Sequence, residues 1–326
     1  MITWERGTET HPRTGLSMQL KLLGTTSLPI DSKIQWIACL PGQKAFATGD
    51  EKKAFLVRPD RPGVAEPITR APASGAFNLP LSTELAEDFC ARPWRGLRFL
   101  SPNEYAVAVD LKKQSVGDVL RTLVFLPDYG TYLQHPQSRL ILSLKCGSIG
   151  LLEKTSGGFK AIDLTRTRGK STLAFAAHPT ETLLTYGDNA GTFHAHPFDQ
   201  SGFGKASKIA AKERKASQCE FIADGKTLVI GGMGYLSTFT YDGGKFSESH
   251  NLPIAVREFA WIEPSNRVFV NQGMHGISTY QYDDKGFTKL ADLQAGQPVQ
   301  QLVASADGKF IAASHEGSVS LIAVAE

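Results

Sequence analysis

Apolar and polar residues alternate along the chain in a recurring pattern of three short strands. Each unit has an apolar strand, a turn, a second apolar strand, a polar or Gly-containing turn, and a third strand. Seven segments fit this pattern, and they begin at Ile34, Leu97, Tyr132, Leu173, Cys219, Glu258 and Gln301. Their first turns are 61, 34, 43, 45, 40 and 43 residues apart and lie at Pro41, Pro102, Pro136, Pro179, Asp224, Pro264 and Asp307. Four of the six steps match the ~40–45 residues of one propeller blade.

A second series runs in step with these turns. A Gly or a turn residue precedes an aromatic residue at Phe159, Phe203, Phe246 and Phe287, which are 44, 43 and 41 residues apart. Each of these positions is expected to open a fourth strand. Short strands that are rich in β-branched and aromatic residues and bounded by Pro, Asp-Gly or Gly are typical of antiparallel meanders.

The repeat predicts the fold class. A four-stranded sheet cannot bury both of its faces alone, so neighbouring sheets must stack. Seven such sheets packed in a ring form an all-β, seven-bladed β-propeller with four antiparallel strands per blade. The last unit has only three strands before Glu326, and residues 15–23 (GLSMQLKLL) repeat the opening of a fourth strand. We therefore expect residues 1–326 to form a single domain whose last blade is closed by an N-terminal strand at 15–23.

Two stretches depart from the regular spacing. Residues 58–95 are rich in Pro, Ala and Gly and predict an elaborated outer strand with a long loop insertion and a short helical turn near 82–89. The segment that begins at Leu111 predicts an extended hairpin within the second unit. Neither stretch indicates a separate domain.

Composition and charge narrow the class of protein further. The 326 residues include 41% hydrophobic and 21% charged residues, which excludes collagen, a coiled coil and general disorder. The net charge of +3 is too small to indicate a nucleic-acid binder. No apolar stretch has the ~18 residues of a membrane span, and the polar N-terminus is unlike a signal peptide, so we expect a cytoplasmic protein that does not bind membranes. Four widely separated cysteines form no zinc or redox motif and are expected to be reduced: Cys39, Cys90, Cys146 and Cys219.

The ends of three predicted strands carry a family resemblance. Phe198-Asp199, Tyr241-Asp242 and Tyr282-Asp283 resemble the Trp-Asp ending of WD repeats. From Gly15 to Glu326 the chain is similar to WD-repeat and related seven-bladed propellers, including the bacterial lactonase-like branch. It lacks both the Trp-Asp dipeptide and the Gly-His dipeptide before the inner strands. The resemblance implies the architecture, which hosts many unrelated functions.

Known catalytic signatures are absent from the sequence. There is no sialidase-type Asp turn, no Gly-x-Ser-x-Gly nucleophile elbow, no phosphate loop followed by Lys-Ser or Lys-Thr, and no Asp-x-Asp-x-Asp calcium loop. We therefore predict no catalytic residues and no cofactor. This absence favours a protein that is not an enzyme.

Histidines and methionines in the repeats have structural interpretations. His194 and His196 should point to one face of a strand, but two ligands are too few for a zinc site, so no metal is predicted. His178 and its equivalent His135 precede a turn proline, which favours a role in the turn. Met233 and Met274, each between glycines, are expected to be turn residues on one rim, which His315 would share.

Basic residues concentrate in one class of loop. In a propeller, the link from the outer strand of one blade to the inner strand of the next shares a face with the turn between the second and third strands. The residues predicted to bind a partner there are Arg92, Trp94, Arg95, Arg166, Arg168, Lys170, Lys212, Arg214, Lys215 and Arg257. Lysines of the second-to-third-strand turns, such as Lys53, should add to this face, and acids such as Asp50 and Glu258 should weaken its field. Clustered cations would attract anionic partners, although loop cations also serve simply to solvate a surface.

These observations favour a non-enzymatic scaffold that binds an acidic peptide or protein at this rim. The alternative is a lactonase-like hydrolase that acts on a phosphorylated sugar lactone, with the basic rim holding the phosphate. A third possibility is a module that binds anions or nucleic acid. Nucleic acid is disfavoured because Trp94 is nearly the only aromatic residue available for base stacking on this face. The sequence indicates no oligomeric state.

Overall fold

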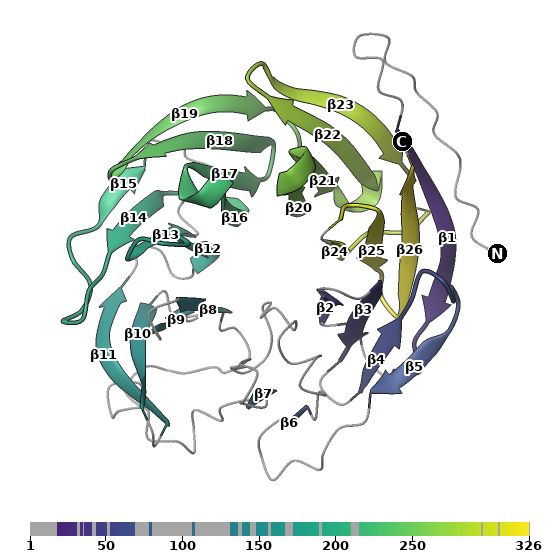
Figure 1. Ribbon diagram of the computed structural model, residues 1–326, viewed down its shortest axis with the longest axis horizontal. Coiled ribbons are helices and arrows are strands. Elements are labelled where there is room, and N and C mark those ends of the chain that lie inside the picture. The colour runs from purple at the N-terminus through teal and green to yellow at the C-terminus, as the bar shows by residue number, and fades with distance from the viewer. Residues whose placement is uncertain are drawn as a thin grey trace.

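The computed structural model describes residues 18–30, 33–34, 36–40, 44–50, 53–68, 78–79, 106–107, 131–135, 139–143, 148–155, 158–166, 172–188, 191–209, 215–294, 296–305 and 307–325. Within these ranges the chain forms six four-stranded antiparallel sheets and one two-stranded pair. Figure 1 shows the sheets arranged around a common centre, in the manner of a propeller. No helix in the described part of the chain is both long and apolar enough to cross a membrane.

Five of the described sheets are meanders of strands that are consecutive in sequence. The first contains β2 (Trp36–Leu40), β3 (Ala45–Gly49), β4 (Ala54–Val57) and β5 (Ala65–Ile68). The next two contain β8 (Thr131–His135), β9 (Arg139–Ser143), β10 (Ser148–Thr155) and β11 (Gly158–Arg166), then β12 (Thr172–Ala177), β13 (Leu183–Asp188), β14 (Phe193–Pro197) and β15 (Ser207–Ile209). The last two contain β16 (Ala216–Ile222), β17 (Thr227–Gly232), β18 (Tyr235–Asp242) and β19 (Lys245–Leu252), then β20 (Glu258–Ile262), β21 (Arg267–Asn271), β22 (Ile277–Asp283) and β23 (Gly286–Leu293).

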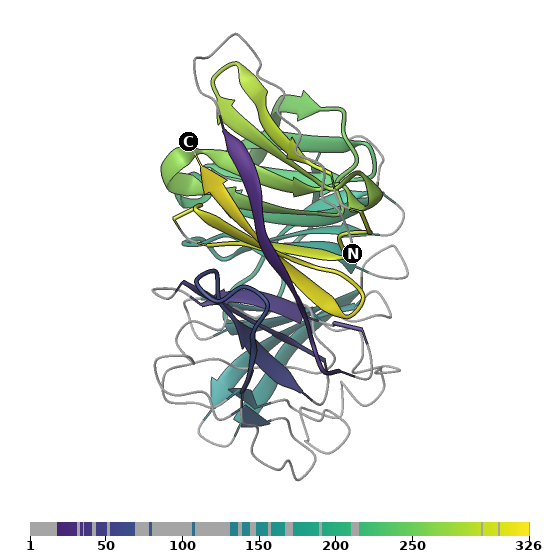
Figure 2. The ribbon, with the colours of Figure 1, turned by 90° about the vertical axis from the view of Figure 1, so that its right-hand side faces the viewer.

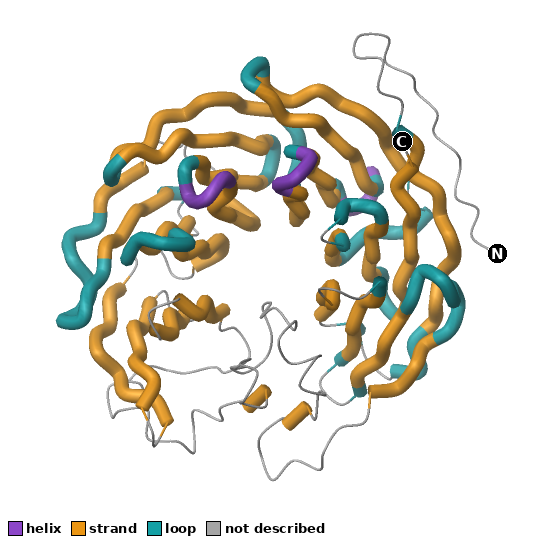
Figure 3. The backbone as a smooth tube through the Cα atoms, viewed as in Figure 1, coloured by secondary structure: helices purple, strands orange, loops and turns teal. Residues whose placement is uncertain are grey.

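The sixth sheet, here called the closing sheet, joins the two ends of the described chain. It contains β24 (Gln301–Ala304), β25 (Phe310–Ser314), β26 (Ser318–Ala325) and β1 (Gln19–Ser27). The two-stranded pair is β6 (Asn78–Leu79) with β7 (Ala106–Val107). Apart from strands, the described residues contain only turns and the short 3-10 helices η2 (Ala223–Gly225), η3 (Glu263–Ser265) and η4 (Gly273–His275), drawn purple in Figure 3.

The predicted repeat coincides with the observed sheets. The innermost strands β2, β8, β12, β16, β20 and β24 begin within three residues of the predicted starts of their units. Of the second predicted unit, which starts at Leu97, the described residues include only β7. The described part of the chain therefore holds six four-stranded sheets where the sequence predicts seven. The helical turn predicted near 82–89 and the hairpin predicted from Leu111 lie outside the described residues.

The N-terminal strand β1 supplies the outer strand of the closing sheet. It pairs antiparallel with β26 along its whole length, from Gln19 opposite Ala325 to Ser27 opposite Ser318, and Figure 2 shows the two strands side by side. The expected strand covered residues 15–23, of which 15–17 lie outside the described residues. The observed strand extends four residues further because a bulge between Leu22 and Gly24 lets the pairing continue.

Apolar side chains fill the spaces between successive sheets. One cluster joins β12–β14 to β16–β18 and includes Phe193 and Phe239, which are at most 2% exposed. The next joins the β16–β19 sheet to the β20–β23 sheet through the fully buried Phe259. Two further clusters connect the closing sheet to its neighbours on both sides. Each fully buried Phe contributes up to about 3 kcal/mol, so face-to-face packing of the sheets is a major source of stability.

Three of the four predicted Gly-aromatic positions open an outer strand, and the fourth does not. β11, β19 and β23 begin at Gly158, Lys245 and Gly286, as expected. Phe203 instead forms an isolated bridge with Phe198, and β15 begins only at Ser207. The Phe203 N–H donates to Asp163 Oδ2 of the preceding sheet (2.8 Å), so it is not available for continuous pairing with β14.

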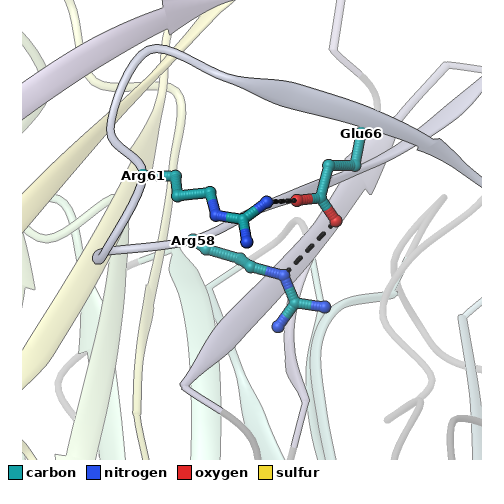
Figure 4. A network of polar contacts seen from close by, with 3 residues as sticks. All are labelled: Arg58, Arg61 and Glu66. Atoms are coloured by element: carbon teal, nitrogen blue, oxygen red, sulfur yellow. Dashed lines mark hydrogen bonds and ion pairs between the residues drawn. The ribbon is translucent and has the colours of Figure 1, made fainter.

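The start of the predicted 58–95 insertion completes the first sheet. Residues 58–64 form a turn that leads into β5, the outer strand of that sheet. Arg58 Nε and Arg61 Nη1 each lie 3.4 Å from a carboxylate oxygen of Glu66, as Figure 4 shows. One carboxylate thus binds both arginines of this hairpin, and the rest of the predicted insertion, apart from β6, lies outside the described residues.

Candidate functional site

The connection edge is defined here as the sheet edge that carries the second-to-third-strand turns and the links from each outer strand to the next inner strand. Two backbone hydrogen bonds show that these loops contact each other. Met233 N donates to the carbonyl oxygen of Lys215 (3.4 Å), and Val256 N donates to that of Gly232 (2.9 Å). Turn and links therefore meet at one edge of the β16–β19 sheet, as the topology predicts.

The ten residues predicted to bind a partner fall into three groups. Lys215 and Arg257 are described and exposed, and both lie in links at the connection edge. Arg166 is the last residue of β11, where the chain enters the link to β12. The others lie outside the described residues: Arg92, Trp94, Arg95, Arg168, Lys170, Lys212 and Arg214.

Arg257 lies across the η4 turn of the next sheet. A Cβ atom on Gly273 would be only 3.0 Å from Arg257 Cδ, so the arginine stem packs directly on the glycine backbone. Gly273 also has a φ of +68°, which favours glycine. Arg257 Nη1 lies 3.4 Å from the carbonyl oxygen of Val299, at the outer limit of a hydrogen bond. Within the described part of the chain, Arg257 and Lys215 form no ion pair, so both charges face solvent.

Two methionines accompany these cations. Only three large hydrophobic side chains are exposed among the described residues: Met233 (78%), Met274 (65%) and Val64 (49%). Met233 lies at the tip of the β17–β18 turn, and Met274 lies in η4 between β21 and β22. Both are turn residues at one rim, as predicted. We call Lys215, Met233, Arg257 and Met274 the methionine strip.

Hydrogen bonds between sheets hold the loops beneath the strip. Ser217 Oγ donates to the carbonyl oxygen of Val256 (2.7 Å). The Gln218 side chain pairs with the backbone of Phe259 twice, because its Nε2 donates to the Phe259 oxygen (2.9 Å) and its Oε1 accepts from the Phe259 N–H (2.8 Å). At the equivalent position of β20, Glu258 accepts a hydrogen bond from Leu302 N. Loops held in this way present their side chains on a preorganised backbone.

A repeated polar pair was missed by the sequence interpretation. Three third-strand serines, each at most 3% exposed, lie at equivalent positions of β18, β22 and β26 and bond to the residue directly opposite on the outer strand. The pairs are Ser237 with Asn251 (2.6 Å), Ser278 with Asp292 (2.5 Å) and Ser320 with Thr25 (3.0 Å). In the sequence, each of these pairs is marked by a Ser that follows the first apolar residues of the third strand. Its partner became evident only with the strand register.

His315 extends the last of these pairs toward the connection edge. Its ring is 1% exposed, with Nδ1 donating to the carbonyl oxygen of Pro298 (3.1 Å) and Nε2 2.9 Å from Ser320 Oγ. Nδ1 thus carries a proton, and in the neutral ring Nε2 accepts from the serine hydroxyl. Burial lowers the pKa of His315 below its usual 6.5. His315 was predicted to lie on the rim, but it is buried beneath the turn and contacts Pro298 and Ser320 there.

The pair of histidines on β14 packs among aromatic rings. His194 stacks on Tyr186, and His196 lies 4.9 Å from the ring of Phe203. His196 Nε2 donates to the carbonyl oxygen of Gly204 (2.8 Å), and burial lowers the pKa of His196. Across the described ranges, no group of three or more His, Cys, Asp or Glu residues could hold a metal ion.

His178 has the turn role that its position before Pro179 predicts. Its Nδ1 accepts from the backbone N–H groups of Thr180 (3.3 Å) and Glu181 (3.0 Å), and its ring is 3% exposed. Among the cysteines, Cys219 is a free thiol whose pKa is raised by burial, and Cys39 lies in β2. Cys90 and Cys146 lie outside the described residues.

The comparisons with known proteins show similarity in fold only. No family model matches the chain, and no curated protein matches it in sequence. A chain in the crystal structure of a mitotic checkpoint complex matches the structure with a TM-score of 0.61 and 12% sequence identity, over 100% of both chains. At this identity the match supports the all-β, propeller-like architecture.

Proposed function

We propose that the chain is a seven-bladed β-propeller that serves as a non-enzymatic scaffold and binds an acidic peptide or protein at its connection edge. The observation that carries the proposal is the pair of exposed cations, Lys215 and Arg257, on links that are clamped by hydrogen bonds between sheets. An arginine fork on a fixed backbone suits carboxylates, because little freedom is lost when the partner binds.

The two edges of the β16–β23 region differ in charge, and the difference favours the connection edge. That edge exposes Lys215, Arg257 and His275, while the carboxylate of Glu258 is engaged by the Leu302 N–H. At the opposite edge the exposed acids and lysines are mixed: Lys226, Asp242, Lys245, Glu263, Asp283, Asp284 and Lys285. A mixed edge has a weak net field, whereas a surface of one sign attracts oppositely charged partners.

In a seven-bladed ring the remaining predicted cations would extend the same surface. Arg92, Arg95, Arg168, Lys170, Lys212 and Arg214 belong to links of the same kind as those that carry Lys215 and Arg257. The matched solved chain belongs to the structure of a complex, which is the setting expected of a scaffold.

Affinity capture with two matched charge reversals tests this proposal. Lys215→Glu with Arg257→Glu reverses the connection edge, and Lys245→Glu with Lys285→Glu reverses two exposed lysines at the opposite edge. The wild type and the opposite-edge variant should retain the same proteins from a lysate of the source cells. The connection-edge variant should lose them. Retention of an unchanged set by all three proteins would refute the proposal.

The same preparations test the hydrolase alternative. The wild type is incubated with 6-phosphogluconolactone, and acid release is followed against the spontaneous rate. The scaffold proposal expects no excess. Turnover that is present in the wild type and lost in the connection-edge variant would replace the scaffold by a hydrolase that uses the cations to hold phosphate.

A further inference from the structure

The methionine strip combines two exposed methionines with two exposed cations on neighbouring sheets. Met233 and Met274 are exposed by 78% and 65%, although burial of such a side chain would contribute up to about 3 kcal/mol. Exposed apolar side chains rimmed by polar groups mark interaction sites. Val64, the remaining exposed large hydrophobic residue, lies in the turn that leads into β5 of another sheet.

Contacts through the backbone bring together the loops that carry the four members of the strip. Met233 is hydrogen-bonded through its backbone to Lys215, and the neighbouring Gly232 oxygen binds Val256, next to Arg257. Arg257 in turn packs on Gly273, next to Met274. The order across the two sheets is therefore lysine, methionine, arginine, methionine.

We propose that the methionine strip binds an extended acidic peptide segment of a partner through two apolar side chains spaced about three residues apart. This proposal rests on the scaffold function above and specifies its ligand. Packed sheets are about 10 Å apart, and an extended chain in the polyproline II conformation has three residues per turn and advances about 3.1 Å per residue, so that side chains three residues apart lie on one face about 9 Å from each other. Two apolar side chains three residues apart in the partner therefore match methionines on adjacent sheets.

The chemistry of the strip selects this partner. Methionine is unbranched and polarisable, so it adapts to different aliphatic or aromatic side chains. Arg257 lies between the two methionines and can receive a carboxylate between the two anchors, while Lys215 can receive one at the flank. The carboxylate of Glu258, next to Arg257 in sequence, accepts a backbone hydrogen bond from Leu302 of the next sheet.

Fluorescence anisotropy with defined peptides tests the proposal. The probe is a labelled peptide with the core Leu-Asp-Glu-Leu in an acidic flank. Two comparison peptides carry Ser in place of both Leu residues, or Asn and Gln in place of the acids. The wild type should bind the probe at least about tenfold more tightly than either comparison peptide, as expected for two anchors. Equal binding of the three peptides, or a probe Kd weaker than about 1 mM, would overturn the proposal.

Matched variants assign the binding to the strip. Met233→Ser with Met274→Ser should raise the probe Kd at least about tenfold, because both anchors are lost. Val64→Ser removes an exposed hydrophobic side chain elsewhere and should leave the Kd unchanged. If the double Ser variant binds the probe within twofold of the wild type, the strip is not the site. If that variant keeps the captured proteins that the charge reversal loses, the scaffold function holds and only the strip proposal fails.

Peroxide treatment gives a second measurement on the unmutated protein. Each methionine sulfur takes one oxygen atom from hydrogen peroxide, water is released, and the side chain becomes a polar sulfoxide. Met233 and Met274 should oxidise before Met18, which is 9% exposed. Mass spectrometry of the digested protein measures this order. Probe binding should fall as these two sites oxidise, and unchanged binding by protein oxidised at both would contradict the proposal.

Discussion

In the β16–β23 region, the polar groups of the connection edge and those of the opposite edge have different hydrogen-bond partners. At the opposite edge, side chains bind within turns or to the neighbouring sheet. Tyr241 Oη donates to Glu181 (2.5 Å), and Glu263 accepts from the backbone of Ala223 (2.9 Å). At the connection edge, the backbone of the loops is bonded between sheets, while Lys215 and Arg257 keep exposed charges. Within this region, the opposite edge thus joins neighbouring sheets through side chains, and the connection edge leaves two cations exposed.

We therefore expect the opposite edge to contribute mainly to stability and the connection edge mainly to binding. Changes to the side chains of the opposite edge that contact another sheet, such as Tyr241 and Glu263, should alter the free energy of unfolding and leave binding intact. Changes to the exposed members of the methionine strip should alter binding and leave stability nearly unchanged, since surface substitutions usually shift stability by about 0.5 kcal/mol or less.

The largest expected effect comes from removing β1, because the closing sheet would lose its outer strand. A protein that lacks residues 1–27 would lose the strand paired to β26 and the packing of Met18, Leu20 and Leu22. We expect the free energy of unfolding to fall by about 4 kcal/mol or more. Urea unfolding measures this loss, and a synthetic peptide of residues 18–27 should restore part of it. A truncated protein as stable as the wild type would show that β1 does not close the ring.

A smaller effect is expected at a glycine of the opposite edge. Gly225 has a φ of +90°, and a Cβ there would lie 2.1 Å from His178 Nε2 of the preceding sheet. Gly225→Ala should therefore cost about 3 kcal/mol through strain and displacement of the histidine. Gly243 has a φ of +50° with no atom within 4 Å of the added Cβ, so Gly243→Ala should cost only about 1 kcal/mol. Thermal melts measure both, and equal costs would show that the contact between the sheets contributes nothing.

The smallest effect is a difference in pH response between the two edges. Burial lowers the pKa of His315 below 6.5, so its neutral form is favoured in the folded state. Its contribution to stability is present above pH 6.5 and is lost as the pH falls through the lower, folded-state pKa. At the opposite edge, hydrogen bonds from the side chain and backbone of Ser201 lower the pKa of Asp199 below 3.8, so its contribution is lost only at more acidic pH.

Unfolding in urea at pH 7.5 and pH 5 measures this response. The wild type should lose stability at pH 5, and His315→Gln should lose less because one titrating group is gone. The buried His196, whose pKa is also lowered, leaves a residual slope in the variant. An identical pH dependence in the two proteins would show that His315 does not titrate in this window.

The sequence allowed much of the architecture to be predicted, for a physical reason. Buried inner strands must alternate with turns at a spacing set by the sheet, so the starts at Glu258 and Gln301 were predicted without error. The outer strand near Phe203 was misplaced because its backbone N–H bonds to Asp163 in another sheet. Such a contact between distant segments leaves no periodic signal in the sequence.

The candidate site was only partly predictable. Topology alone placed Lys215 and Arg257 at one edge. Met233 and Met274 were predicted as turn residues, but their role beside the cations depends on exposure, which glycine neighbours do not determine. The serine pairs depend on strand register, and the bulge between Thr238 and Phe239 shows how local that register is.

The most direct test of the account is the affinity of the acidic leucine probe for the two charge-reversal variants at one ionic strength. We predict that Lys215→Glu with Arg257→Glu raises the probe Kd at least about tenfold, while Lys245→Glu with Lys285→Glu leaves it within about twofold of the wild type. An equal loss in both variants would mean that only net charge matters, and no loss in either would mean that the connection edge does not bind acidic partners.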